Sequence, residues 1–174
     1  MADEKLEKTS LLSEWYPEKS SLSNIAIDNR EVIKYLRDTY SEQHSFPFFQ
    51  KGIFWANLGE NIGAEINKIR PVIILSKTQY NLSDTVVVAP LTTGHINRPF
   101  LLPYQYKLFQ SKYPGLERDS IVKLDQIRTI SVSRFKNNKA DSCQTPLDEI
   151  TPITIVNTQD WHRMKAKLKN LFSI

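Results

Sequence analysis

Three polar side chains in the middle of the chain could act together on a phosphate group. Arg70 carries a planar, permanently charged guanidinium that can contact a phosphate at two points. Thr92 has a hydroxyl that can donate to a phosphate oxygen, and Glu65 could accept a proton or hold Arg70 in place. Each also has a structural explanation, because Arg70 could pair with Glu65 or the backbone, Thr92 could merely end a strand, and Glu65 could be solvated. The residue types therefore allow phosphate chemistry but do not establish it.

The charge of the chain favours an anionic partner. The 174 residues carry a net charge of +4, but residues 1–49 have a net charge of −3 and residues 50–174 one of +7. A body this basic favours nucleic acid, the commonest anionic partner, although a basic surface that serves only solubility is the alternative. With 40% hydrophobic and 24% charged residues, the composition is that of an ordinary globular protein. The length predicts one domain with an appended element.

Several classes of protein are disfavoured. No run approaches the eighteen or so apolar residues that a membrane helix needs, and the charged N-terminus lacks the apolar segment of a secretory signal. Cys143 is the only cysteine, so an internal disulfide is impossible and a zinc site built on cysteines is nearly excluded. The three histidines, His44, His95 and His162, lie far apart in the chain. We therefore expect a cytoplasmic protein that needs no metal or other cofactor.

Residues 1–49 are predicted to be a helical N-terminal extension. Apolar residues recur there at the spacing of one helix face: Leu22, Ile25, Val32 or Ile33, Leu36 and Tyr40. A separate short helix could precede this one and stop before Pro17, and Pro47 disfavours helix at Phe46. Residues 50–174 then form the main domain.

The main domain is predicted to be a small antiparallel barrel. Short β-branched runs bounded by turn residues predict strands at 53–56, 71–75 and 85–89, and further strands are expected at 100–102 and within 120–130. Strands this closely spaced, without long helices between them, favour a barrel.

A final helix is predicted over 157–172. Its apolar side carries Trp161, Met164, Leu168, Leu171 and Phe172. Its lysine-rich side is expected to be solvated. The two aromatic residues of the first strand, Phe54 and Trp55, are expected in the core.

Three short blocks follow one another in the barrel region. The first is Lys51-Gly52-Ile53-Phe54-Trp55 with Gly63-Ala64-Glu65 and Ile69-Arg70-Pro71-Val72. The second is Val86-Val87-Val88-Ala89-Pro90-Leu91-Thr92-Thr93, and the third is Glu117-Arg118-Asp119-Ser120 running into Asp125-Gln126-Ile127-Arg128-Thr129-Ile130. In this order and spacing they resemble the MazF/PemK family of toxin endoribonucleases. The resemblance covers about 80 of the 174 residues, and the final helix also fits, but residues 1–49 lie outside it.

The resemblance implies a fold, an activity and partners. Family members are homodimers on a small SH3-like antiparallel β-barrel, mainly β with flanking helices, which is shared with the gyrase-poisoning toxin CcdB. Most cut single-stranded RNA without a metal by attack of the 2′-hydroxyl, which yields a 2′,3′-cyclic phosphate and a 5′-hydroxyl. A cognate antitoxin neutralises them, and operator DNA is expected as a partner only of the toxin–antitoxin complex.

The resemblance also assigns roles to residues. Arg70 and Thr92 match the family's catalytic arginine and threonine, with Glu65 in support. His95 could transfer a proton or stack on a base, although it could also be an ordinary loop histidine. The residues expected to contact RNA are Asn61, Asn67, Lys68, Thr93, His95, Lys123, Asp125, Gln126 and Arg128.

One substitution separates this chain from the PemK branch. That branch uses a histidine in the Gly-x-Glu loop together with a basic and an acidic residue on the late strand. Ala64 stands in place of the histidine, while Lys123 and Asp125 match the other two. The site is therefore expected to be MazF-like rather than PemK-like, with Asp125 orienting neighbours such as Arg128 instead of acting as a base.

Two questions stay open at this point. The chain could be a non-catalytic binding module on the same fold, which grips a protein as gyrase poisons do or binds nucleic acid or an antitoxin. The acidic residues 1–49 could lie over the basic body and restrain it, as an antitoxin tail does, or could pack as a helix pair on the barrel side or extend a dimer interface. The apolar face of the helix favours packing.

Overall fold

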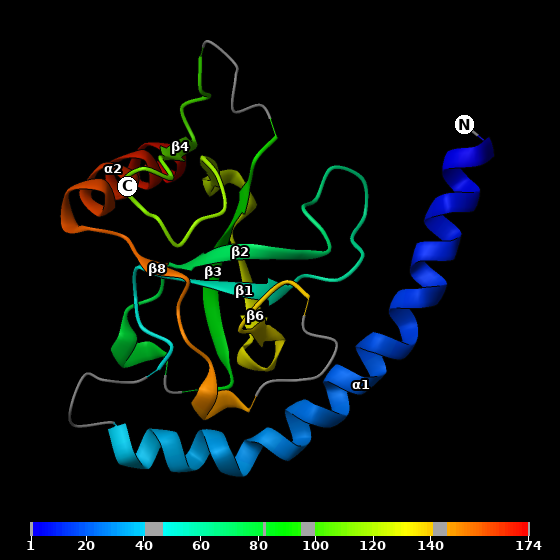
Figure 1. Cartoon of the computed structure of the whole chain (residues 1–174). Helices are drawn as coiled ribbons and strands as arrows, with labels where there is room; N and C mark the ends of the chain where they lie inside the picture. Colours follow the sequence, from blue (N-terminus) through cyan, green and yellow to red (C-terminus); the bar gives the residue numbers. More distant parts are fainter. Residues whose placement is uncertain (1, 41–46, 82, 95–99, 141–145, 174) are drawn as a thin grey trace.

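A curved antiparallel sheet lies at the centre of the molecule, with one long helix along one side and a second helix at one end (Figure 1). The computed structural model describes residues 2–40, 47–81, 83–94, 100–140 and 146–173. The helices are α1 (Ala2–Tyr40) and α2 (Thr158–Phe172). The strands are β1 (Gly52–Asn57), β2 (Ile69–Ile74), β3 (Thr85–Thr92), β4 (Gln105–Leu108), β5 (Ser120–Lys123), β6 (Arg128–Ser131), β7 (Phe135–Lys136) and β8 (Thr154–Ile155). Short 3₁₀ helices are η1 (Thr78–Tyr80), η2 (Leu124–Gln126), η3 (Val132–Arg134) and η4 (Leu147–Glu149).

Strand β3 organises the sheet because it has three neighbours in succession. It pairs with β6 over residues 85–88, with β2 over 88–90 and with β5 over 91–92, always antiparallel. Strand β1 lies on the other side of β2 and also pairs with β7 and β8. A strand that passes from one neighbour to another makes the sheet turn a corner. The small antiparallel β-barrel with flanking helices is therefore confirmed.

The sheet separates two apolar clusters. Successive side chains of a strand point to opposite faces, so Ile53 and Phe54 of β1 belong to different clusters. Phe54 packs with Phe48 and Phe135, and the three ring centroids lie 5.0 to 6.0 Å apart. Because both faces of the central strands are buried, the fold positions these strands firmly.

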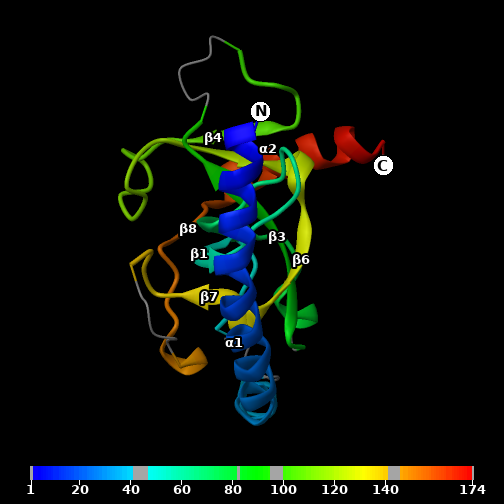
Figure 2. The ribbon, with the colours of Figure 1, turned by 90° about the vertical axis from the view of Figure 1, so that its right-hand side faces the viewer.

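Helix α1 is continuous, which corrects the expectation of a separate helix that stops before Pro17. Pro17 lies within the helix. A proline removes one backbone hydrogen bond and can bend a helix without ending it, and α1 curves round the barrel (Figures 1 and 2). Contacts hold the helix on both sides of the proline, since Trp15 and Glu18 touch the barrel and Ile33 is buried in its core. The expected helix end at Phe46 lies outside the described residues.

Two strand predictions also needed correction. Residues 100–102 form no strand, and Phe100 is 84% exposed. The strand lies farther on, at β4, after a turn in which the Gln105 backbone N–H donates to the Leu102 carbonyl at 2.9 Å. Gln105 is a buried polar residue, so the apolar pattern did not reveal β4. Residues 120–130 contain two strands, β5 and β6, because η2 interrupts them.

Helix α2 covers the second cluster with only part of its predicted apolar side. Trp161 and Met164 are buried there, and Leu168 packs against them. Leu171 and Phe172, which belong to the same predicted apolar side, are 37% and 56% exposed. The end of α2 projects beyond the barrel (Figure 2).

Asp160 joins the start of α2 to the sheet region. Its backbone N–H donates to Oδ1 of Asn157 at 2.9 Å, which caps the helix. Its carboxylate accepts hydrogen bonds from the hydroxyls of Tyr106 at 2.8 Å and Tyr113 at 2.6 Å, and lies 2.8 Å from Nζ of Lys112. Burial would raise the pKa of Asp160, but the bonds from Lys112, Tyr113 and Tyr106 together outweigh it and lower the pKa to about 2.

Replacing Asp160 should therefore destabilise the fold in a pH-dependent way. The folded pKa lies near 2 and the ordinary value is 3.8, so the stabilisation is complete above about pH 4 and is lost as the pH falls toward 2. We expect Asp160→Asn to lower the free energy of unfolding at pH 7 by roughly 2 kcal/mol, measured by urea denaturation with tryptophan fluorescence. The difference should fall to about half at pH 3. Asp28→Asn, on the exposed side of α1, is the control; an Asp160→Asn effect of equal size at both pH values would contradict this account.

Candidate active site

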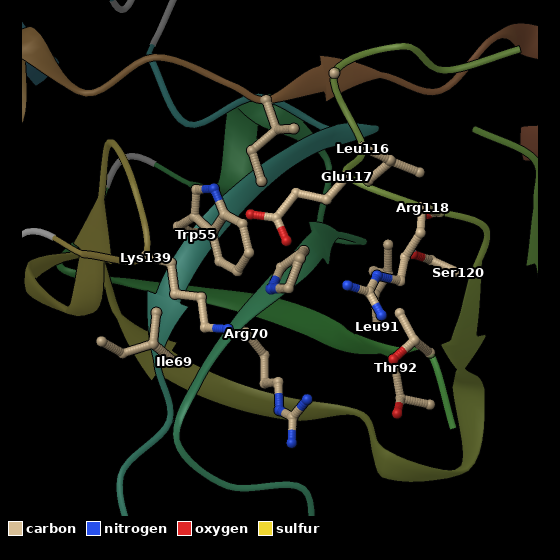
Figure 3. A pocket seen from close by; sticks show the side chains of 14 residues that line it. Trp55, Ile69, Arg70, Leu91, Thr92, Leu116, Glu117, Arg118, Ser120 and Lys139 are labelled. Carbon is tan, nitrogen blue, oxygen red and sulfur yellow. The ribbon is translucent and has the colours of Figure 1, made fainter. Parts of the chain in front are cut away.

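A cavity of about 180 Å³ opens where β2 begins and β3 ends (Figure 3). Its lining comes from β1, β2, β3, the segment that leads into β5 and two later loops. The lining residues are Trp55, Ile69, Arg70, Pro71, Leu91, Thr92, Thr93, Gly115, Leu116, Glu117, Arg118, Ser120, Lys139 and Ile153. Three cationic side chains and one carboxylate are among them, so the cavity suits an anion.

The pairing of β2 with β3 brings Arg70, near the start of β2, to the same end of the sheet as Thr92, the last residue of β3. The strands pair Val72 with Pro90. From this pair, β2 leads back to Arg70 and β3 leads on to Thr92 at the same end of the sheet, where β3 pairs with β5. The side chains of both residues line the cavity. The structure thus brings Arg70 and Thr92, the two residues with the central predicted roles, into one cavity.

The guanidinium of Arg70 is anchored through one of its nitrogens. Nε donates to the backbone carbonyl of Asn67 at 3.2 Å. Among the described residues, no carboxylate lies within ion-pair distance of Arg70. A guanidinium that is fixed at Nε and keeps its two terminal amino groups can make a two-point contact with a phosphate.

The hydroxyl of Thr92 is also oriented. Oγ1 accepts a hydrogen bond from the backbone N–H of Gly94 at 3.1 Å. This bond uses an oxygen lone pair, so the hydroxyl hydrogen remains available to donate to a ligand. Thr93 is exposed and lines the same cavity. Arg70 and Thr92 therefore present donors to the cavity from adjacent strands.

Sequence reasoning missed three charged residues of the cavity: Glu117, Arg118 and Lys139. Figure 3 shows the Glu117 carboxylate pointing into the cavity, with Lys139 and Arg118 on either side of it. All three are exposed. Adjacent charges shortly before a predicted strand were the available signal for Glu117 and Arg118. Nothing in the sequence around Lys139 pointed to the cavity.

Trp55 was also placed wrongly, in the core rather than at the site. It alternates along β1 with the fully buried Phe54 and Ala56, and its own side chain is half-buried and lines the cavity. An aromatic ring in the wall of a cation-lined cavity offers a surface on which a nucleobase can stack.

Glu65 lies outside the cavity. It is exposed in the connection between β1 and β2, where its backbone N–H donates to the Ile62 carbonyl at 3.3 Å. Arg70 bonds to Asn67 rather than to Glu65. The structure therefore does not bring Glu65 together with Arg70 and Thr92.

Several residues expected to contact RNA hold the connection of residues 58–68 together. Nδ2 of Asn61 donates to the Ile66 carbonyl at 2.7 Å, and Nδ2 of Asn67 donates to Oε2 of Glu60 at 3.1 Å. Lys68 adopts a positive φ of 65° at the end of this loop and lines a second hollow beside α1. These residues belong to the loop that leads into β2 and so to Arg70.

Gln126 and Arg128 reach the same loop from the opposite side. Oε1 of Gln126 accepts from the Ile66 N–H at 2.7 Å, and its Nε2 donates to the Ala64 carbonyl at 3.1 Å. Arg128 donates to the Ile66 carbonyl at 3.4 Å and to Oδ1 of Asn61 at 3.3 Å. The side chains are engaged with the loop and do not line the cavity.

The two residues that match the PemK branch pair with each other. Nζ of Lys123 lies 3.0 Å from Oδ2 of Asp125 and 5.3 Å from the centre of the Tyr104 ring. Neither lines the cavity, and Asp125 is paired with Lys123 rather than Arg128. His95 falls within residues 95–99, outside the described part of the chain.

The described residues contain neither a group of metal-binding side chains nor a membrane-spanning helix. In the segments that the structure describes, no three histidine, cysteine, aspartate or glutamate side chains are grouped so that they could hold a metal ion. No helix within those same segments is long and apolar enough to cross a membrane.

Comparison with known proteins gives one consistent family. The family model described as "PemK-like, MazF-like toxin of type II toxin-antitoxin system" matches residues 50–172. The chain is similar to endoribonuclease MazF of Staphylococcus saprophyticus, with 39% identity over 48% of this chain and 68% of the relative. It is similar to endoribonuclease MazF of Staphylococcus epidermidis, with 32% identity over 64% of this chain and 94% of the relative.

A solved structure shares the fold. MazF of Deinococcus radiodurans alone has a TM-score of 0.53 at 19% identity, and covers 72% of this chain and 96% of its own. The same toxin in a MazE–MazF crystal structure has a TM-score of 0.50 at 18% identity, with the same coverage of both chains. Because the family model spans most of the chain and a relative is matched over nearly its whole length, this chain belongs to the PemK-like, MazF-like toxins of type II toxin–antitoxin systems.

Proposed function

We propose that this toxin cleaves single-stranded RNA in the cavity that Arg70 and Thr92 line. The observation that carries the proposal is that Arg70 and Thr92 line the same cavity, together with two further cationic side chains. An RNA phosphodiester is an anion whose chemistry these donors fit. The two staphylococcal relatives, both called endoribonuclease MazF, support this class of reaction.

RNA supplies its own nucleophile, the 2′-hydroxyl beside the phosphate. In the proposed mechanism, the terminal amino groups of Arg70 contact the non-bridging phosphate oxygens and the Thr92 hydroxyl donates to one of them. These contacts strengthen as charge builds on the oxygens, and one such donor contributes about 3 kcal/mol. Alignment of the 2′-oxygen with the phosphorus contributes on the order of 7–11 kcal/mol. The products are a 2′,3′-cyclic phosphate and a 5′-hydroxyl, and the reaction as written uses no metal.

Glu117 supplies the proton acceptor in this mechanism. Its carboxylate points into the cavity between Lys139 and Arg118. It takes the proton of the 2′-hydroxyl as that oxygen attacks phosphorus, and the departing 5′-oxygen takes a proton from water. This assignment replaces the supporting role expected of Glu65, whose carboxylate lies outside the cavity. Arg118 and Lys139 offset the charge of the RNA backbone.

The proposed partners follow from the family. A cognate antitoxin neutralises the toxin, which the MazE–MazF structure of a fold neighbour supports. The toxin acts as a homodimer in the cytoplasm, and operator DNA is bound only by the toxin–antitoxin complex.

Replacing Arg70 should remove cleavage but leave the fold intact. We expect Arg70→Ala to reduce kcat for a labelled single-stranded RNA by about 10²–10³-fold, because the phosphate loses its two-point donor. Arg70→Lys should recover little, because an ammonium lacks the planar fork. The matched control is Arg30→Ala, which removes the same charge from an exposed position on α1. The assay contains EDTA, and the cleaved ends are mapped.

The outcome of this assay also distinguishes an enzyme from a binding module. A non-catalytic module would bind the labelled RNA and leave it whole. Full activity of Arg70→Ala would remove the site assignment, and cleavage that EDTA abolishes would overturn the mechanism.

Glu117 and Glu65 should behave differently when each is replaced by glutamine. We expect Glu117→Gln to lower kcat by about 10²-fold, because the proton acceptor is gone. Glu65→Gln should keep the rate within about twofold, because its carboxylate lies outside the cavity. The reverse result would return the acceptor role to Glu65. The measurement is kcat of both variants with the same labelled single-stranded RNA.

A further inference from the structure

Helix α1 lies outside the region that the family model matches, yet it touches the loop that precedes Arg70. The loop of residues 58–68 leads from β1 into β2, and Arg70 is the second residue of β2. Figure 1 shows the first half of α1 running beside this loop. Contacts of α1 with the loop can therefore affect the direction in which the Arg70 side chain points.

A continuous set of hydrogen bonds joins α1 to Arg70. Nζ of Lys8 donates to Oε2 of Glu60 at 2.9 Å. Nδ2 of Asn67 donates to the same oxygen at 3.1 Å, and the carbonyl of Asn67 accepts from Nε of Arg70 at 3.2 Å. Asn67 thus holds Glu60 with its side chain and Arg70 with its backbone. The path from the helix to the guanidinium contains only these four residues.

The carboxylate of Glu60 makes this path sensitive to Lys8. The Glu60 side chain is only 8% exposed, whereas that of Lys8 is 36% exposed. A carboxylate that has left water must keep its cation and its hydrogen-bond donors, because an unpaired buried charge is strongly destabilising. Without Lys8, the loop must rearrange to return Glu60 to water. Asn67 would then move, and with it the acceptor of the Arg70 Nε–H.

Other contacts hold α1 close against the barrel beside the loop. Gly59 has a φ of +75°, and a Cβ at this position would clash with the indole ring of Trp15. The Trp15 ring also lies 5.7 Å from the guanidinium carbon of Arg134, and Glu18 accepts a hydrogen bond from Asn57. The helix is therefore held against the start of the loop, next to the position where Lys8 bonds to Glu60.

We propose that the Lys8–Glu60 pair of α1 and the loop is a positioning device for Arg70. Lys8 holds Glu60, Glu60 holds Asn67, and the carbonyl of Asn67 orients the guanidinium toward the phosphate. The extension thus supports the reaction instead of restraining it. This proposal rests on the function proposed above for Arg70, and Lys8 and Glu60 are positioning residues because neither lines the catalytic cavity with Arg70.

The kinetic test is Lys8→Met, which removes the charge but keeps the length of the side chain. We expect kcat for RNA cleavage to fall about tenfold with KM changed less than about twofold, because a misdirected Arg70 loses contacts in the transition state. Lys8→Arg should retain the rate, because arginine can still donate to Glu60. Lys5→Met, an exposed position one turn earlier in α1, is the matched control and should behave as wild type. Restraint by α1 predicts the opposite sign, a faster Lys8→Met.

A second readout does not require catalysis. The ¹⁵N-labelled Nε–H of Arg70, assigned by its absence in Arg70→Lys, should exchange slowly with solvent in wild type and faster in Lys8→Met and Glu60→Gln. Unchanged exchange in both variants would overturn the proposal, whether or not the protein cleaves RNA. Faster exchange in a protein that leaves RNA whole would keep the positioning device and reject the proposed function. Faster exchange with an unchanged kcat would mean that the orientation of Arg70 by Lys8 and Glu60 does not affect catalysis, and would overturn that part of the proposal.

Discussion

The antiparallel register between β2 and β3 brings Arg70, near the start of β2, and Thr92, at the end of β3, to one cavity. A slip of one residue would turn one of these side chains to the other face of the sheet. Apolar residues fix this register. Val72 of β2 and Val88 of β3 belong to the cluster on one face, whereas Ile73 and Ala89, which are paired across the strands, belong to the cluster on the other. Because both faces are buried, any slip would bury or expose the wrong side chains. The polar pair is therefore placed by its apolar neighbours.

The loop before β2 receives most of the remaining polar contacts near the cavity. Gln126 and Arg128 bond to it from the side of η2 and β6, and α1 bonds to it from the other side. A loop has no ladder of its own to hold it, so side chains from separate elements must satisfy its backbone groups. The backbone from which the Arg70 side chain extends is therefore held in place. The site combines a rigid strand pair with a loop that side chains make rigid.

The sequence predicted the barrel and the final helix because β-branched runs and helical spacing are local signals. Arg70 and Thr92 were found through motif resemblance, and the structure places both in the cavity. Strand β4 was missed because its first residue, Gln105, is buried although polar. Continuity of α1 through Pro17 depends on contacts with the barrel, which no local pattern reports.

The roles of the polar residues around the site depend on contacts that only the folded structure shows. Asn61 and Gln126 were expected to contact RNA, but their side chains are bonded to the loop. A sequence shows that a residue can donate a hydrogen bond, and it does not show whether the acceptor is a ligand or a neighbouring carbonyl. Glu117 and Lys139 come from segments far from Arg70 in the chain, and only the folded barrel brings them to one cavity.

The burial of α1 residues limits where the chain can be truncated. Ile33 and Leu36 are 4% and 2% exposed and pack with Phe48 in the cluster under the sheet, while the match to the family begins at residue 50. A fragment trimmed to residues 50–172 would leave Phe54 and Phe135 facing water, and such an apolar patch promotes aggregation. The stretch of chain that is shared with relatives is thus shorter than the stretch that folds as one unit.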